Sequence, residues 1–526
     1  MSLFDRLYQP ERAARVAVLY DHTEITYDNL RDTTIRAAEA LNALNINAGD
    51  RVGILLLDSP EFIASFVAII SMGAIAVPIN LALRREDQLF ILKDCGAVAA
   101  IIEATAAATL FRDSDVQTEL QHLLVVSRDS PAEVLDSPRN HAQDARATAP
   151  IGGMNVQTFS DAGRRQLGRE FPARGENADA FVLYTSGSTG EPKGAVHTQP
   201  DIFYTNETFC REVLQLREGD RLFSSSRLPF AYGLGNSFTF PLLNGFTSVL
   251  CREKPTPEVV SRVFREYRPT IFFGVPVVYS MLLEHQRKGH QLDTSSLRLC
   301  VSAGEALPAQ LGEDWENTFG VEVLDGIGST EMLHMFMSNH ERDVRYGSSG
   351  KLLRGYEARL VDHDGRPTVQ GEAGNLWIKG RSAALRYWRR PETTSETFVD
   401  GWVRTGDLYC CDNDEIWWHM GRSDDCFKPT GQWVSPVEVE NVLLRHEAVR
   451  AAAVVEGFDE HKLSCVCAFV VTGGGTDAVE QLLREFCENA LPRFKQPRRY
   501  LFVSELPYTA TGKVQRFKLR EQLRAE

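Results

Sequence analysis

Residues 181–194 constrain the fold of this chain most, because an apolar run leads directly into a loop of hydroxyl groups and glycines. The run Phe181–Tyr184 is typical of the end of a buried strand. The next six residues, Thr185–Gly190, read TSGSTG, and Lys193 follows after Glu-Pro. Glycines let backbone N–H groups approach a ligand closely, successive N–H groups in a turn bind anions, and a lysine adds a point charge. We therefore predict a phosphate-binding loop rather than a Ser/Gly surface hairpin, the commoner outcome for such residues.

The position of the lysine excludes one familiar kind of phosphate loop. In the GxxxxGK[ST] motif the lysine opens a helix. Here Lys193 lies between Pro192 and Gly194 and precedes a second apolar start, Ala195-Val196. The chain therefore does not carry that motif.

The rest of the chain alternates predicted helices with buried strands, which indicates an α/β fold with parallel sheets and crossover helices. Helices are expected at 30–44, 83–94 and 258–268, and strands at 52–57, 97–102, 270–275, 297–302 and 321–325. The longest apolar stretch, residues 62–79, contains Gly73 and Pro78. We interpret it as a buried helix running into a buried strand rather than a membrane span. A length of 526 residues predicts two or more domains.

Charge and cysteine content narrow the class of protein. The 57 basic and 71 acidic side chains give a net charge of −14, which disfavours nonspecific binding to nucleic acid or anionic membranes. The ten cysteines include no CxxC pair, so zinc or redox chemistry has little support. The N-terminal residues contain no apolar signal core. We expect a cytoplasmic protein with reduced thiols and no nucleic-acid or membrane partner.

Two predicted strands run into glycine turns that suit a ligand crevice. The strand at 297–302 leads into Gly304-Glu305-Ala306, and the strand at 321–325 leads into Gly326-Ile327-Gly328. Ligands of open parallel sheets bind at the carboxyl ends of the strands. The next residues, Ser329-Thr330-Glu331, offer hydroxyls for a phosphate and a hard oxygen ligand for Mg²⁺. The same three residues are also a common helix cap.

Another candidate ligand residue, Asp407, follows Gly406 in a predicted turn of sequence VDGWVRTGDLY. A carboxylate offers paired acceptors for two ribose hydroxyls, although aspartates are common in turns.

Beyond residue 423 the composition and the pattern of predicted helices and strands change. A helix opened by Ser435, strands at 449–455 and 464–471 and a helix at 479–490 predict a small α+β domain of about 100 residues.

These motifs, in this order, resemble those of the adenylate-forming superfamily, the acyl-CoA synthetases and their relatives. Two stretches, PFAYGLGN at 229–236 and LDGIGSTEMLHMF at 324–336, look like those of its benzoate-type aryl-CoA ligases. The resemblance implies a large N-terminal domain, residues 1–423, of parallel and mixed sheets with flanking helices and a β-barrel-like part. It also implies a small mobile α+β C-terminal domain, residues 424–526.

The resemblance implies a complete nucleotide site. The phosphate loop would hold the β,γ-phosphates of ATP, Thr330 the α-phosphate, and Glu331 with Thr185 a magnesium ion. The two glycine turns would flank adenine, and Asp407 with Arg422 would bind the ribose. The implied ATP-binding residues are Thr185, Ser186, Gly187, Ser188, Thr189, Gly190, Lys193, Gly304, Glu305, Ala306, Asp325, Gly326, Ile327, Thr330, Asp407, Arg422 and Lys513.

By the same resemblance, Ala231, Tyr232, Gly328, His334 and Lys513 would contact the acid substrate. Ala231 and Gly328 are small and leave room for a flat ring, on which Tyr232 could stack. His334 could donate a hydrogen bond to the substrate carboxylate or a ring substituent. The alternative is a packed histidine on a helix opened at Ser329.

The C-terminal part carries the implied catalytic lysine. The pattern PxTxTGKxxR at 507–516 matches the family's lysine loop, so Lys513 would be catalytic together with Glu331 and Thr330. Asp424 would be the interdomain hinge. Rotation about it would bring a glycine-containing loop to coenzyme A, with the contacts assigned to Lys428, Gly431 and Trp433.

The implied function is that of an ATP-dependent aryl-acid:CoA ligase acting on benzoate, a hydroxybenzoate or 2-aminobenzoate (anthranilate). The carboxylate would attack ATP to give an acyl-adenylate and pyrophosphate, and the CoA thiol would then release AMP. ATP, Mg²⁺ and CoA are the expected cofactors, and a monomer or homodimer is expected. A stand-alone enzyme that loads an aryl acid onto a carrier-protein phosphopantetheine is the alternative, and a catalytically dead nucleotide-binding scaffold is a third. The similarity of PFAYGLGN at 229–236 and GSTEMLH at 328–334 to aryl-CoA ligases favours free CoA as the acceptor.

Overall fold

The computed structural model describes most of the chain. The described residues are 1–112, 118–127, 154–159, 171, 175, 177–185, 191–362, 364–423, 425–427, 429, 434–459, 463–472, 476–508 and 514–525. Ser186–Gly190, Asp424, Lys428, Gly431, Trp433 and Lys513 lie outside them, so the predictions made for these residues stay predictions.

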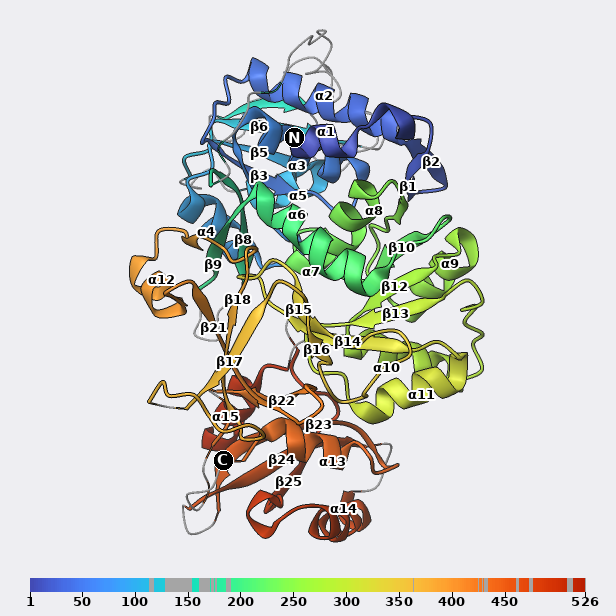
Figure 1. The fold of residues 1–526 in the computed structure, drawn as a ribbon, viewed down its shortest axis with the longest axis vertical. Helices are drawn as coiled ribbons and strands as arrows, with labels where there is room; N and C mark the ends of the chain where they lie inside the picture. The colour runs from blue at the N-terminus through green and yellow to red at the C-terminus, as the bar shows by residue number, and fades with distance from the viewer. Residues whose placement is uncertain are drawn as a thin grey trace.

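Two large sheets with parallel centres form the N-terminal part, as the alternating pattern predicts (Figure 1). The nine-stranded sheet has the order β16 (Lys351–Leu352), β15 (Met335–Ser338), β14 (Val323–Gly328), β13 (Leu299–Ser302), β12 (Ile271–Gly274), β10 (Arg221–Ser224), β11 (Thr247–Val249), β1 (Val16–Tyr20) and β2 (Thr23–Thr26). The eight-stranded sheet has the order β19 (Arg386–Tyr387), β9 (Lys193–Thr198), β8 (Asp179–Thr185), β4 (Ile75–Pro78), β3 (Arg51–Leu55), β5 (Ala99–Glu103), β6 (His122–Val126) and β7 (Asn155–Thr158).

Helices cover both large sheets. The central strands β3, β4, β5, β12 and β13 are therefore buried on both faces. The helices of this part are α1 (Leu3–Leu7), α2 (Tyr27–Ala43), α3 (Pro60–Met72), α4 (Arg85–Cys95), α5 (Ala104–Leu110), α6 (Gln199–Thr205), α7 (Ala231–Leu234), α8 (Phe240–Leu243), α9 (Pro257–Tyr267), α10 (Pro276–Arg287), α11 (Ala309–Phe319) and α12 (Pro391–Thr397). Two π-helical segments, η2 (Asn206–Leu214) and η3 (Gly235–Thr239), continue α6 and α7.

The apolar stretch at 62–79 forms a buried helix and a buried strand, as predicted. Ser59 caps α3 by accepting a hydrogen bond from the Phe62 N–H, and Gly73 ends the helix with a φ of 92°. The chain then enters β4, all of whose residues are buried. Among the described residues, we find no helix that is both long and apolar enough to cross a membrane.

A third, antiparallel sheet curves beside the first two as the predicted barrel-like part. Its strands are β17 (Glu357–Val361), β18 (Gly374–Lys379), β20 (Phe398–Val399), β21 (Trp402–Cys411) and β22 (Trp417–Arg422). The C-terminal elements lie at the opposite end of the molecule from the N-terminus (Figure 1). They are β23 (Val449–Phe458), β24 (Ser464–Thr472), β25 (Arg499–Phe502), α13 (Pro436–Leu443), α14 (Thr476–Ala490) and α15 (Arg516–Ala525).

Three local expectations are wrong. Ser329 opens no helix: its Oγ accepts from the Met332 N–H in a turn, and β15 begins at Met335. The Gly326–Gly328 segment is not a turn, because β14 continues through it and pairs antiparallel with β15. Asp407 lies inside β21 rather than in a turn, directly after Gly406, whose φ of 76° lets the strand bulge.

The phosphate segment joins the antiparallel strands β8 and β9, in which Thr185 pairs with Lys193. The two strands that flank the predicted phosphate loop therefore form a hairpin, the structure that the sequence interpretation did not favour. Lys193 begins a strand, which agrees with the prediction that it does not open a helix. A hairpin and an anion-binding tip are compatible, since the strands supply rigidity and the loop supplies N–H groups.

We predict that Gly194→Ala destabilises this hairpin. A Cβ at residue 194 would lie 2.6 Å from Val182 Cγ1 and 2.9 Å from Tyr184 Cζ. Relieving such overpacking costs about 1–3 kcal/mol. Urea unfolding should show a lower midpoint with an unchanged slope, whereas Gly175→Ala, where the added Cβ meets nothing within 4 Å, should behave like wild type. Equal midpoints for the two variants would contradict the packing described here.

Candidate active site

The edge strand β19 joins the phosphate hairpin to the predicted metal ligand. Tyr387 pairs with Ala195 of β9, and its hydroxyl donates to Glu331 Oε1 at 2.6 Å. The Lys193 ammonium lies 5.0 Å from the centroid of the Tyr387 ring. Burial and the Glu331 carboxylate raise the pKa of Tyr387 above its usual range, so the hydroxyl keeps its proton. Lys193 and Glu331, far apart in sequence, therefore lie on either side of one tyrosine.

A buried histidine, His197, holds the backbone of Thr330, the residue before Glu331. His197 Nε2 lies 2.8 Å from the Thr330 carbonyl oxygen, and its Nδ1 lies 2.9 Å from Asp201 Oδ2. Because a carbonyl oxygen only accepts, Nε2 carries a proton. Asp201 also accepts from the Thr198 backbone N–H and hydroxyl in a capping box at the start of α6. The strand that leaves the phosphate loop thus holds the segment predicted to contact the α-phosphate.

The side chains of the two predicted metal ligands, Glu331 and Thr185, are of types that suit a magnesium ion. Glu331 supplies a carboxylate and Thr185, at the other predicted position, a hydroxyl, which are the hard oxygen ligands that Mg²⁺ takes. The described residues contain no group of three or more His, Cys, Asp or Glu side chains placed to hold a metal. Mg²⁺ in nucleotide sites is commonly bound by one or two protein carboxylates together with the substrate phosphates.

The predicted adenine-flanking segments lie side by side. Parallel pairing of β13 with β14 sets Ser302 opposite Asp325, so Gly304, just after β13, and Ile327, within β14, belong to adjacent segments. Asp325 Oδ2 accepts from the Leu307 N–H at 3.1 Å. Burial raises the pKa of Asp325 to about 8, although the hydrogen bonds it accepts oppose the shift.

The predicted ribose pair is also assembled. Asp407 and Arg422 face each other across β21 and β22, and Arg422 Nη1 donates to Asp407 Oδ1 at 3.1 Å. Arg422 Nη1 also reaches the Thr405 carbonyl oxygen at 3.0 Å. Asp407 is only 8% exposed, which fixes its carboxylate in one orientation.

Of the five predicted acid-pocket residues, Tyr232, Gly328 and His334 lie together, and Ala231 precedes Tyr232 on α7. Ala231 and Tyr232 begin α7, and the Tyr232 ring centroid lies 5.6 Å from that of His334. A Cβ at Gly328 would lie 2.5 Å from the His334 carbonyl oxygen, so only glycine allows this approach. The Tyr232 hydroxyl donates to the Val301 carbonyl oxygen at 3.1 Å, which leaves its ring rather than its hydroxyl for a substrate.

His334 is enclosed by aromatic rings. The centroids of Phe209 and Phe240 lie 4.7 and 4.6 Å from that of His334, and His334 Nε2 lies 3.2 Å from Asn236 Oδ1. Burial lowers the pKa of His334 to about 3, so the imidazole is neutral near pH 7. His334 is therefore a packed histidine, as one of the two interpretations from sequence predicted. It lies directly before β15, however, and not on a helix.

The C-terminal part contacts Glu305, in one of the segments predicted to border adenine. The Val514 N–H donates to Glu305 Oε1 at 3.0 Å, across 209 residues of sequence. Val514 is the residue after Lys513. Farther along, Arg516 forms ion pairs with Glu440 at 2.8 Å and with Asp425 at 3.8 Å, which connect α15 to the segment after the predicted hinge.

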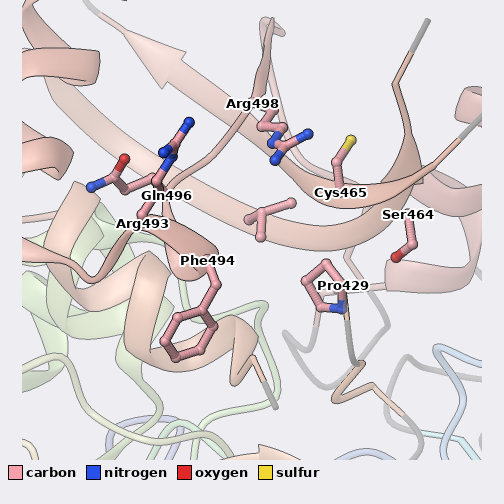
Figure 2. Close-up of a pocket in the computed structure, with 8 residues that line it drawn as sticks. Pro429, Ser464, Cys465, Arg493, Phe494, Gln496 and Arg498 are labelled. Atoms are coloured by element: carbon pink, nitrogen blue, oxygen red, sulfur yellow. The ribbon is translucent and has the colours of Figure 1, made fainter. Parts of the chain in front are cut away.

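A cavity of about 350 Å³ opens in the C-terminal part beside Pro429 (Figure 2). Its lining residues are Pro429, Ser464, Cys465, Val466, Arg493, Phe494, Gln496 and Arg498. The lining includes two arginines and a phenylalanine, residue types that suit an anion carrying an aromatic ring. The sequence analysis missed this cavity, as well as His197 and Tyr387. Of these, only His197 had a sequence signal, a histidine within an apolar run directly before the Thr-x-x-Asp cap.

Comparison with known proteins decides the family. Residues 8–388 match the model of the AMP-binding enzyme family, and residues 438–513 match that of the AMP-binding enzyme C-terminal domain. The chain belongs to the AMP-binding enzyme family. It is an AMP-forming acid–thiol ligase, so the reading as a catalytically dead scaffold is wrong.

Individual relatives resemble the chain along its whole length. It is 40% identical to a benzoate–CoA ligase of Thauera aromatica over 97% of this chain and 93% of that protein. The crystal structure of the anthranilate CoA ligase AuaEII in complex with anthranoyl-AMP matches with a TM-score of 0.90 and 36% identity, over 99% of this chain and 97% of that one. A benzoate CoA ligase from Burkholderia xenovorans LB400 matches with a TM-score of 0.86 and 34% identity, over 99% and 100%.

We predict that Asp325→Asn flattens the pH dependence of stability. Because the folded-state pKa of Asp325 is raised to about 8, its contribution is full below the unfolded pKa near 4 and is lost as the pH rises through 8. Asparagine does not titrate and still accepts the Leu307 N–H. The variant should therefore gain stability relative to wild type between pH 5 and pH 8, by roughly 1–4 kcal/mol at about 1.4 kcal/mol per pKa unit.

Urea unfolding of the ligand-free protein at several pH values measures this difference. Asp28→Asn, at an exposed position on α2, is the matched control and should track wild type at every pH. A constant difference between Asp325→Asn and wild type from pH 5 to pH 8 would rule out the raised pKa.

Proposed function

We propose that this protein is an ATP-dependent ligase that joins a benzoate-type aromatic acid to coenzyme A. The observation that carries the proposal is the end-to-end similarity to benzoate- and anthranilate-CoA ligases. The small residues Ala231 and Gly328 beside the Tyr232 ring support a flat aromatic acid. Relatives named as CoA ligases favour free CoA over a carrier protein as the acceptor.

The first half-reaction brings two anions together, so it needs neutralisation of charge more than proton transfer. We assign the β,γ-phosphates to the loop Thr185–Lys193 and the α-phosphate to Thr330. When bound, Mg²⁺ would be held by Glu331 and Thr185 and would offset phosphate charge. Tyr387 and His197 support these residues through the contacts described above.

Lys513 is the proposed catalytic residue of this step, between the substrate carboxylate and the α-phosphate. The Val514–Glu305 hydrogen bond supports the assignment, because it brings the neighbouring residue to the nucleotide face. The carboxylate oxygen attacks the α-phosphorus, the bond to the β-phosphate breaks, and pyrophosphate leaves. The lysine ammonium would offset the charge that gathers between the reacting groups.

The second half-reaction needs a thiol in the place of that lysine. We assign the exchange to rotation about Asp424, which is a hinge-type change. Lys428, Gly431 and Trp433 would then contact CoA. The neighbouring cavity with Arg493 and Arg498 offers charges for its phosphates, and Phe494 offers a ring for its adenine. The thiolate attacks the acyl carbon, and AMP leaves.

We predict that Lys513→Ala separates the two half-reactions. Pyrophosphate release should fall about 10²–10³-fold, the usual loss when one group that stabilises transition-state charge is removed. Thioester formation from supplied benzoyl-adenylate should stay within a few fold of wild type. Lys518→Ala, at an exposed position on α15, is the control and should affect neither step. Equal loss of both half-reactions would contradict the assigned role.

We also predict the class of acid. Pyrophosphate release with CoA and ATP should be fastest for benzoate, hydroxybenzoates or 2-aminobenzoate, and slow for short and medium fatty acids. The reason is the proposed contact with the Tyr232 ring, on which a flat aromatic acid stacks and a flexible chain does not. A preference for the fatty acids would overturn the aromatic assignment, and turnover only with a carrier protein in place of CoA would overturn the assigned acceptor.

A further inference from the structure

Tyr387 contacts two predicted nucleotide ligands at once but is itself neither part of the phosphate loop nor a metal ligand. It is 4% exposed and lies on β19, a strand of two residues at the edge of the eight-stranded sheet. Its hydroxyl donates to Glu331 Oε1 at 2.6 Å, and its ring face lies 5.0 Å from Lys193 Nζ.

The surroundings hold this tyrosine in one position. Its backbone pairs with Ala195 of β9, and its N–H donates to Thr394 Oγ1 at 3.0 Å. Phe398 packs edge-on against the ring, with the centroids 5.4 Å apart. A side chain fixed by backbone pairing, packing and a hydrogen bond can orient its partners, because it has little freedom of its own.

Each contact suits a separate purpose. A hydrogen bond from a neutral hydroxyl to a carboxylate is short and strong, and it fixes the plane of the carboxylate. Groups that orient a metal ligand in this way change metal affinity or activity by 10–100-fold when they are removed. The ring face attracts the Lys193 ammonium, which keeps the lysine against the same tyrosine that binds the Glu331 carboxylate.

We propose that Tyr387 is a positioning residue for the magnesium and triphosphate side of the site: its hydroxyl orients Glu331 toward the metal, and its ring keeps Lys193 beside the phosphates. The inference rests on the proposed function, which makes Glu331 a metal ligand and Lys193 a phosphate ligand. It adds a residue that couples the two, through a strand distant in sequence from both.

Tyr387→Phe tests the hydroxyl and retains the ring. The Mg²⁺ concentration that gives half-maximal pyrophosphate release should rise about tenfold. The rate at saturating Mg²⁺ should change much less, and thioester formation from supplied benzoyl-adenylate should not change. Tyr387→Leu removes the ring as well, and should raise the KM for ATP in addition.

A matched control is Tyr346→Phe. Tyr346 also donates to a glutamate, with 2.8 Å between its hydroxyl and Glu316 Oε2, but on α11 and away from the phosphate hairpin. This variant should show wild-type Mg²⁺ dependence. The same tenfold shift in Tyr346→Phe would mean that losing any tyrosine–glutamate hydrogen bond loosens the fold, and would overturn the proposal.

Binding measured without turnover gives an independent readout. Mn²⁺, used as a paramagnetic probe with ATP and no acid, should bind Tyr387→Phe more weakly than wild type, while ATP in EDTA should bind both equally. In a Glu331→Gln background, Tyr387→Phe should have no further effect on Mn²⁺ binding, because the hydroxyl acts through that carboxylate. Unchanged Mn²⁺ affinity in Tyr387→Phe, or an equal further loss in the Glu331→Gln background, would sink the proposal.

These outcomes distinguish the inference from the proposed function. If wild type activates no benzoate-type acid but binds Mn²⁺ with ATP, the proposed substrate fails and the Mn²⁺ comparison still decides the role of Tyr387. If wild type makes the aryl-CoA product and Tyr387→Phe has normal Mg²⁺ and Mn²⁺ dependence, the proposed function stands and the positioning role fails.

Discussion

The site depends on the antiparallel pairing of β9 with its two neighbours. On one side β8 sets Thr185 opposite Lys193, and on the other side β19 sets Tyr387 opposite Ala195. All other strands of that sheet pair in parallel. Parallel neighbours need long crossovers, whereas antiparallel neighbours can place their ends next to each other. This edge of the sheet is therefore where Lys193, the strand that it begins and Tyr387 come within contact distance.

Strand β9 and its neighbour β19 also hold the segment that contains Thr330 and Glu331. His197, near the end of β9, holds the carbonyl of Thr330, and Tyr387 holds the side chain of Glu331. Two adjacent residues, the proposed phosphate ligand Thr330 and the proposed metal ligand Glu331, are thus held from one strand and its partner. Electrostatic catalysis benefits from groups that are already oriented before the charge develops. The burial of His197 and Tyr387 supplies that rigidity.

The sequence predicts the repeating parts of this fold well. Long apolar runs and amphipathic periods mark β3, α3, β12, β13, β23 and β24 because burial on one or two faces leaves a pattern in the residues. It fails where backbone geometry depends on a partner strand. Gly326–Gly328 reads as a turn, yet β15 pairs with it, and Asp407 reads as a turn residue, yet Gly406 makes a bulge within β21. Ser329 has the composition of a helix cap, but the chain turns into β15 instead.

Family motifs located Lys193, Thr330, Glu331, Asp407 and Arg422 in the sequence, and the described residues bring them together in the expected groups. The supporting residues were not predictable in the same way. Tyr387 lies in a segment without periodicity, and its role depends on a partner 56 residues earlier in the chain. The arginines of the C-terminal cavity are likewise ordinary surface charges in sequence, and only the strands and turns around them create the hollow.

The hydrogen bond between the Val514 N–H and Glu305 has a consequence for how the enzyme senses its own state. Glu305 belongs to the segment predicted to border adenine, and Val514 belongs to the segment that carries Lys513. One carboxylate thus takes part in the contact between the two parts of the chain and also lies in the proposed nucleotide site. Linkage is reciprocal, so any free energy by which a bound nucleotide favours this contact equals the free energy by which the contact favours that nucleotide. If ATP and AMP favour this contact to different degrees, the exchange of one for the other changes the free energy that holds the C-terminal part against the N-terminal part.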